Sequence, residues 1–415
     1  MGFRFTNPWW VAFGAVTGLF VCNGPVLGFT FGVFLKPIMA DTGWDRGAVS
    51  FALSVGGILS ALAVPVLGRM MDRWSIRRVA LPGLVVYAIC LSFVGASPAS
   101  FWIFALIFAL AEMTSAIQTP LGYAKAISAW FDPRRGLALG IAMAGVGLGG
   151  SVIPQLANLL IERIGWRGAY VSLALLTLAI AFPAVALWIR EPRPGEGERH
   201  AAVSAEGLPG LTAREGVRLR RFWVLAAVFF LVAVAINGTV AHVIPLLTDR
   251  GFSRDTATAI FGFFGLATLV GRLLAGYLVD RIFAPHIASV FFLAPIAGFG
   301  FLASAAGPLP AVGVVLFGLG LGTEIDLIAF LVSRYFGQRS FGEFYGYFFM
   351  VFGLGSSLGR FLGGCVFDLT GSYNAAFIGA AIALVLGVLL VNRLGAYPYP
   401  VHRRIALPLA TEPAI

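Results

Sequence analysis

Charged side chains are scarce in this sequence. Asp, Glu, Lys and Arg together make up 12% of its 415 residues, whereas a soluble chain would carry about 25%. Hydrophobic residues make up 59%, which excludes an ordinary soluble fold and indicates a chain that crosses a lipid bilayer many times. The formal net charge is +10, but the cations lie in short connectors between apolar runs, which is a pattern of membrane topology. We therefore expect the lipid bilayer, and no nucleic acid, as a partner.

Cysteine and histidine are few as well. The three cysteines, Cys22, Cys90 and Cys365, all fall inside apolar runs, so we interpret them as small core residues rather than disulfides or metal ligands. The histidines of the linker, the tail and one span start have no partner motif for catalysis, and no ATP-binding P-loop pattern occurs. We predict no enzyme activity, no metal and no cofactor, and a driving force supplied by a gradient.

Long apolar runs separated by short polar connectors predict an all-α membrane protein with about twelve transmembrane helices. The first run is too long for a signal peptide and is interrupted at Asn23-Gly24-Pro25. The expected spans are 9–39, 47–68, 79–96, 100–130, 136–162, 168–189, 222–247, 255–279, 284–306, 309–334, 341–367 and 374–393. They form an N-terminal six-helix bundle (1–189), a hydrophilic linker (190–221), a C-terminal six-helix bundle (222–394) and a tail (395–415).

The distribution of arginine predicts the orientation. The linker, the tail and the connectors with most arginines share one side of the predicted topology, and cytoplasmic loops carry such an excess. We therefore expect both termini to be cytoplasmic. We also expect the protein to be a monomer in the cell (inner) membrane.

The two halves repeat. Gly43-Trp44-x-Arg46 matches Gly251-Phe252-x-Arg254, and 251 − 43 = 208. Gly68-x-x-x-Asp72-Arg73 matches Gly276-x-x-x-Asp280-Arg281, and 276 − 68 is again 208. Two six-span halves joined by a linker are typical of parallel transporter repeats.

The connector from Gly68 to Arg78 resembles the signature loop of the major facilitator superfamily, G-x-x-x-D-R-x-x-x-R-R. The resemblance implies a gate on the cytoplasmic side that breaks and re-forms in each transport cycle. A carboxylate at a helix end can cap a neighbouring helix N-terminus through a contact weak enough to break. A topology signal with a tight turn is the alternative interpretation. The expected gate residues are Gly68, Asp72, Arg73, Gly276, Asp280 and Arg281.

A narrower resemblance follows from the segment 130–145, WFDPRRGLALGIAMAG. It is similar to the start of span five in the monocarboxylate transporter and oxalate–formate exchanger branch. In that branch an arginine in span eight binds the carboxylate, and Arg272 occupies the matching place. Thr268 stands where animal monocarboxylate carriers have an acid, and Phe352 stands where the oxalate exchanger has a lysine. One central cation favours cargo with one carboxylate.

Arg272 is the cation on which this interpretation depends. It lies eight residues before Asp280 and seventeen after Asp255, which is about 12 Å and about 25 Å along a helix. A guanidinium cannot lose its proton to reduce the cost of burial, so it needs water, an anion or a buried acid there. We predict that it faces a water-filled path and binds a carboxylate cargo. A structural ion pair with a buried acid is the alternative.

Four residues are candidates for proton coupling. Asp326 should lie at the depth of Arg272, as its partner in the empty state or as the proton carrier. Glu324 is about 200° further round the same helix, so both acids cannot face one path. The other two candidates are Asp249, at the extracellular end of span seven, and His242, two turns deeper. Each of the four can instead be a solvated or helix-contact residue.

Other polar residues at membrane depth could contact the cargo. The candidates are Gln118, Tyr123, Asn23 at the break in span one, and Tyr347; packing, or a kink at Asn23, is the alternative. We interpret Lys36 and Arg360 as interfacial.

The sequence therefore predicts a secondary transporter of small organic anions, with monocarboxylates as the expected cargo, by proton symport or anion exchange. An exporter of amphiphilic drugs or siderophore-like compounds is the alternative within transport. A non-transporting sensor on the same scaffold and a polytopic membrane enzyme are the alternatives outside it.

Overall fold

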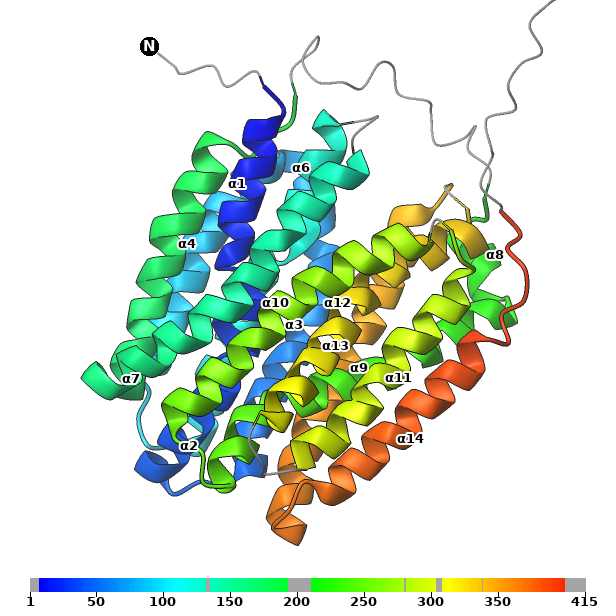
Figure 1. Ribbon diagram of the computed structural model, residues 1–415. Helices are drawn as coiled ribbons and strands as arrows, with labels where there is room; N and C mark the ends of the chain where they lie inside the picture. The colour runs from blue at the N-terminus through cyan, green and yellow to red at the C-terminus, as the bar shows by residue number, and fades with distance from the viewer. Residues whose placement is uncertain are drawn as a thin grey trace, which may run out of the picture.

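The computed structural model describes residues 7–131, 135–192, 210–279, 281–303, 308–337 and 339–399. The described chain is helical nearly throughout (Figure 1), which confirms the predicted all-α membrane fold. The N-terminal half comprises α1 (Trp9–Phe20), η1 (Gly24–Gly28), α2 (Phe31–Thr42), α3 (Arg46–Trp74), α4 (Ile76–Gly95), α5 (Phe101–Ser115), η2 (Ala116–Gln118), α6 (Pro120–Trp130) and α7 (Arg135–Leu187). The C-terminal half comprises α8 (Ala213–Val217), α9 (Arg220–Asp249), α10 (Arg254–Val279), α11 (Ala284–Ala303), α12 (Leu309–Tyr335), α13 (Phe341–Thr370) and α14 (Asn374–Val391).

Two of the expected spans are broken in the middle. The first changes from α1 through the π-helical turn η1 to α2, at the interruption that the sequence predicts. The fourth was expected to be continuous from 100 to 130, but it breaks at η2, just before Pro120. A residue before proline is disfavoured in the helical conformation, and Thr119 is accordingly extended, with φ −81° and ψ 163°.

Helix α7 contains two expected spans. Among the described residues, eleven helices are long and apolar enough to cross a membrane. The apolar stretch within α7 is 51 residues long. At about 1.5 Å per residue that stretch is more than twice the roughly 30 Å of a hydrocarbon core. Gly165, with φ 73° and ψ 168°, interrupts it. Gly145 lies against Val16, but Trp188 returns to Gly14, so the chain reverses and crosses twice, giving twelve crossings.

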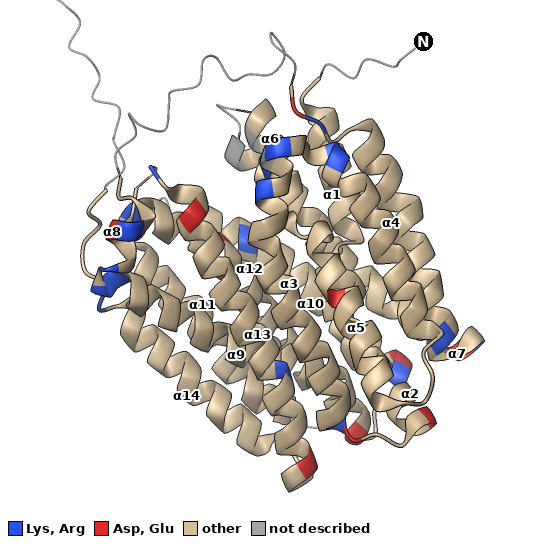
Figure 2. Cartoon of the chain, turned by 180° about the vertical axis from the view of Figure 1, so that it is seen from behind, with Lys and Arg blue, Asp and Glu red and all other residues tan. Residues whose placement is uncertain are grey.

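The two sides of the bundle are defined by helix ends. The linker side is where α7 ends at Leu187 and α9 begins at Arg220, and the far side is where α2 ends at Thr42 and α9 ends at Asp249. Charged residues gather at these two sides, and few lie between them (Figure 2).

The sequence repeat corresponds to a repeated turn on the far side. Gly43 follows α2 with φ 75°, and Gly251 follows α9 with φ 89°. Glycine adopts such positive φ values at low cost, and each glycine is followed three residues later by the arginine that begins the next helix, Arg46 or Arg254.

The two halves meet closely near the middle of the bundle. A Cβ atom at Gly147 would lie 2.9 Å from the carbonyl oxygen of Gly265, so α7 and α10 touch through backbone. Helices α3 and α13 also approach each other closely, and a Cβ atom at Gly353 would lie 2.8 Å from that of Ala61. Toward the linker side, at the top of Figure 1, the two halves lean apart.

Candidate functional site

Arg272 lies in α10 and forms an ion pair with Asp326 of α12. Its Nη1 donates to Oδ1 of the acid at 2.8 Å. The Arg272 side chain is 5% exposed, whereas that of Asp326 is 36% exposed. The Nε of Arg272 is buried without a partner. The arginine is thus enclosed, while the acid that neutralises it can be reached by solvent.

Close packing of α10 on α12 brings the pair together. A Cβ atom at Gly271 would lie 2.7 Å from the carbonyl oxygen of Leu319, and one at Gly322 would lie 2.2 Å from that of Thr268. These glycines allow the two backbones to touch, which brings the Arg272 guanidinium within hydrogen-bonding distance of Asp326.

Other segments contribute side chains around this pair. Tyr345 of α13 lies within electrostatic reach of both Arg272 and Asp326, and Cys22, at the break between α1 and η1, lies within reach of Arg272. The pair therefore has both halves of the molecule around it, which is where a transported ligand has to bind in alternating access.

Glu324 has a different environment from Asp326. Its residue is 0% exposed and neither carboxylate oxygen has a partner. Gly320, one turn earlier on the same face, packs against Pro295 and Ile236. This face of α12 is therefore directed into the C-terminal half, as the angular separation of the two acids predicts.

Asp249 and His242 belong to a far-side network that joins the two halves. Asp249 lies 2.6 Å from Nζ of Lys36 and 2.7 Å from Nη1 of Arg46; these three residues are called the far-side cluster. Arg46 also donates to the Tyr373 hydroxyl at 2.7 Å, which lies 3.2 Å from Nδ1 of His242.

The sequence interpretation missed Arg46, although the repeat contains a signal for it. Arg46 and Arg254 are repeat partners, since 254 − 46 = 208, and both contact the opposite half. Arg46 binds Asp249, and Arg254 donates to the carbonyl oxygen of Val33 at 2.8 Å. The repeat arginines thus mark where the halves are joined.

Asn23 connects the break in the first span to α5. Its Nδ2 donates to Oε2 of Glu112 at 3.2 Å and also to Oγ of Ser115.

Arg360 was expected to be interfacial, but it is partly buried beside α3. Its Nη2 donates to Ser357 at 3.3 Å.

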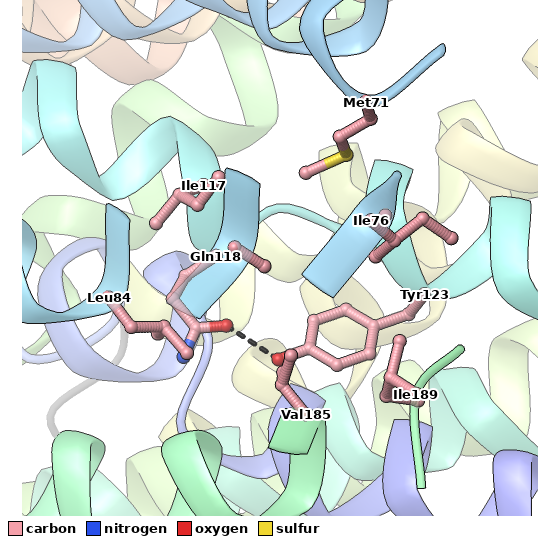
Figure 3. A pocket seen from close by; sticks show the side chains of 10 residues that line it. Met71, Ile76, Leu84, Ile117, Gln118, Tyr123, Val185 and Ile189 are labelled. Atoms are coloured by element: carbon pink, nitrogen blue, oxygen red, sulfur yellow. Dashed lines mark hydrogen bonds between the residues drawn. The ribbon is translucent and has the colours of Figure 1, made fainter. Parts of the chain in front are cut away.

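Gln118 and Tyr123 bind each other inside the N-terminal half. The Tyr123 hydroxyl donates to Oε1 of Gln118 at 2.7 Å, and the tyrosine packs against Gly18. They line a small hollow with mostly apolar walls (Figure 3). The other lining residues are Met71, Ile76, Ala80, Leu84, Ile117, Gly122, Val185 and Ile189.

The remaining site candidates lie on the linker side. Tyr347 donates to Glu343 at 3.1 Å, one turn away on α13. Arg281 donates to the carbonyl oxygen of Tyr277 at 2.9 Å and stacks on its ring. Gly68 and Arg73 lie on α3, and Gly276 lies on α10. The Asp72 side chain and Asp280 lie outside the described residues.

Among the described residues, no three or more His, Cys, Asp or Glu side chains lie close enough together to hold a metal ion. The described site offers ionic and hydrogen-bonding chemistry: an enclosed guanidinium, an accessible carboxylate and nearby aromatic and thiol groups.

Comparison with known proteins agrees with this architecture. The sequence matches the family model described as Major Facilitator Superfamily over residues 9–360. The chain belongs to the major facilitator superfamily. Human monocarboxylate transporter 11 is 26% identical over 84% of this chain and 73% of that protein. The MFS-type transporter pynF of Aspergillus niger is 30% identical, but the match covers 46% of this chain and 44% of that protein.

Among solved structures, the nucleoside transporter NupG has a similar fold. Its TM-score is 0.70 at 16% identity, over 94% of this chain and 99% of that chain. As a member of the superfamily, the protein is a multi-pass membrane transporter, and its curated relatives include monocarboxylate transporters.

Proposed function

We propose that this superfamily member is a secondary transporter of small organic anions, chiefly monocarboxylates, and that Arg272 binds the carboxylate. The observation that carries this proposal is the unequal burial of the ion pair: the arginine side chain is 5% exposed and the Asp326 side chain 36%. A cargo carboxylate can take the place of Asp326 because the two groups offer the same acceptor chemistry.

The exchange of partners supplies a coupling mechanism. When cargo binds Arg272, the displaced Asp326 carboxylate loses its cation inside the protein, which favours protonation of the acid. The loaded site with its proton and the empty site with its ion pair then carry the same net charge. Proton symport follows if Asp326 returns the proton to the other side, and anion exchange follows if the carrier reorients only when loaded. Asp249, Glu324 and His242 are the alternative coupling groups.

The cargo contacts and the gate complete the proposal. Asn23, Gln118, Tyr123 and Tyr347 are proposed to contact the cargo during the cycle, and the two repeated motifs at Gly68 and Gly276 are proposed to close the linker side. By the distribution of arginine we propose that the linker side and both termini face the cytoplasm, with the halves 1–189 and 222–394 moving as units in the cell membrane.

The test compares Arg272→Lys with Arg163→Lys, a matched change at an exposed arginine. Lysine keeps the charge but loses the planar fork that binds a carboxylate through two hydrogen bonds. We expect lactate or pyruvate uptake into proteoliposomes to fall at least about tenfold in Arg272→Lys, a loss of ~1.4 kcal/mol, and to be unchanged in Arg163→Lys.

Ligand binding provides an independent measurement. Short monocarboxylates should raise the unfolding temperature of the purified wild-type protein, since a ligand bound only by the folded state stabilises it. They should not raise that of Arg272→Lys. If amphiphilic compounds stabilise both proteins and short carboxylates stabilise neither, the cargo is an amphiphile and the proposal is wrong.

A further inference from the structure

A second pair of opposite charges lies between the two halves, separate from Arg272. Glu112 of α5 is 2% exposed, and Arg360 of α13 faces it across α3, close enough for their charges to attract. Glu112 is eleven residues from the far-side start of α5, and Arg360 is ten residues from the far-side end of α13. Both are therefore about 15 Å from the far side, whereas Arg272 is about 27 Å along α10 from it.

Two glycines of α3 create the space for this pair. A Cβ atom at Gly56 would lie 2.5 Å from Cβ of Glu112, and one at Gly57 would lie 2.6 Å from Nη2 of Arg360. Any larger residue at either position would force one charged side chain away. The pair thus sits in the seam that has to open when the far side opens.

Neither charge is fully satisfied in this seam. Oε2 of Glu112 accepts from Asn23 at 3.2 Å, but Oε1 is buried without a partner. Arg360 donates to Ser357, but its Nε is buried without a partner. An ionised carboxylate with an unsatisfied oxygen costs far more in the interior than in water.

The other groups that face Glu112 do not supply a second charge. Tyr87 of α4 and Tyr170 of α7 lie within its electrostatic reach, and α3 presents Gly56. Asn23 and Ser115 are neutral. Arg360 is the cation in this set, and it stays beyond ion-pair distance with Ser357 as its partner.

We propose that Glu112 is a proton-binding site whose protonation accompanies closure of the far side. With the far side open, water reaches the carboxylate and it can be ionised. For the seam to close, Oε1 takes one proton from water of the far side, and it returns that proton to water when the seam opens again. Arg360 favours the ionised form, and so sets the pH at which the site changes state. This inference does not depend on Arg272 or on the cargo.

The experiment measures a distance across the far side without any cargo. Spin labels at Ala99→Cys and Ala375→Cys, both exposed, report the separation of the halves in a background without the three native cysteines, in lipid nanodiscs. We expect the wild-type distance distribution to shift to shorter distances as the pH falls. Glu112→Gln, a neutral mimic of the protonated acid, should stay at short distances at every pH.

Arg360 provides the matched test if Glu112→Gln fails to fold. Loss of a nearby cation favours the neutral acid, so the pH midpoint of the distance change should move upward in Arg360→Gln and return toward wild type in Arg360→Lys. If Arg360 only supported the packing of the helices, its charge would not determine the pH midpoint, and Arg360→Lys would not restore it. The proposal is overturned if Glu112→Gln keeps the wild-type pH response, if Arg360→Gln leaves the midpoint in place, or if Asp249→Asn alone abolishes the response.

Discussion

At the scale of the residue, glycine has two distinct roles in α7. A Cβ atom at Gly149 would lie 2.1 Å from the carbonyl oxygen of Phe20, whereas one at Gly140 would meet nothing within 4 Å. The first glycine is required by backbone packing of α7 on the end of α1. The second is not required by any neighbour in this conformation.

This difference predicts opposite effects of alanine at the two positions. Gly149→Ala must push α7 away from α1, and overpacking of this kind costs about 1–3 kcal/mol. Gly140→Ala should be neutral or stabilising by up to about 1 kcal/mol, because alanine favours the helix. Thermal unfolding of both variants in the same detergent measures the difference. Equal unfolding temperatures would show that α7 and α1 do not pack closely at Gly149.

Arg272 and Asp326 are the residues for which the sequence was most informative. A cation that cannot be neutralised, placed deep in an apolar run, demands an anion, and Asp326 lies at the matching depth. The observed ion pair is the alternative that the sequence left open for the empty protein. The same reasoning could not identify Arg46, because an arginine beside a loop can be solvated by water and so does not require an anionic partner.

At the scale of the element, the end of α2 is tied to the turn within α7. Arg167, two residues after Gly165, forms an ion pair with Asp41 in the last turn of α2. Trp166 donates to the same carboxylate at 3.2 Å. The Arg167 hydrogen bond and then that of Trp166 lower the pKa of Asp41 from its ordinary value of 3.8.

The lowered pKa of Asp41 determines how the stability of the protein depends on pH. The folded state prefers the ionised acid, so Asp41 contributes its full stabilisation above pH 3.8 and loses it as the pH falls through the lower pKa of the folded state. We expect the wild type to unfold at a higher temperature than Asp41→Asn near neutral pH. The two should converge in acid well below pH 3.8.

Arg167→Gln serves as the control for this contact. In that background Asp41→Asn should have little further effect at neutral pH, because the main partner is already gone. An undiminished effect of Asp41→Asn would assign the stabilisation to Trp166 or to another contact of the acid.

At the scale of the whole molecule, α3 and α13 form part of the seam between the halves. The Cβ atom of Ala61 would lie 2.8 Å from one at Gly353. A disulfide needs about 3.5–4.5 Å between the Cβ atoms, so a small separation of these helices would accommodate the bond without rotation of either half.

The double variant Ala61→Cys with Gly353→Cys, in a background without the native cysteines, should therefore form a disulfide. We expect alternating access to separate these helices, so the oxidised protein should lose most of its transport and recover it on reduction. Proteoliposome uptake before and after a reducing agent measures this. Each single variant is the control, and unchanged uptake by the fully oxidised double variant would show that the seam does not open there.

The fold class and the repeat could be predicted because they depend on local properties. Apolar length determines which segments can cross the bilayer, and the same glycine occupies the same positive-φ turn in each half at Gly43 and Gly251. The break at η2 was missed, although Pro120 is its local cause, because the apolar run continues through it.

The sequence by itself determined the number of spans, the motif repeat and the demand of Arg272 for an anion, since these follow from hydropathy, spacing and one unalterable charge. Only the tertiary structure decided which partners meet. Arg46 with Asp249 and Glu112 facing Arg360 are separated by 203 and 248 residues. The angle at which each helix faces its neighbour selects such pairs, and packing between helices, rather than spacing along one of them, sets that angle.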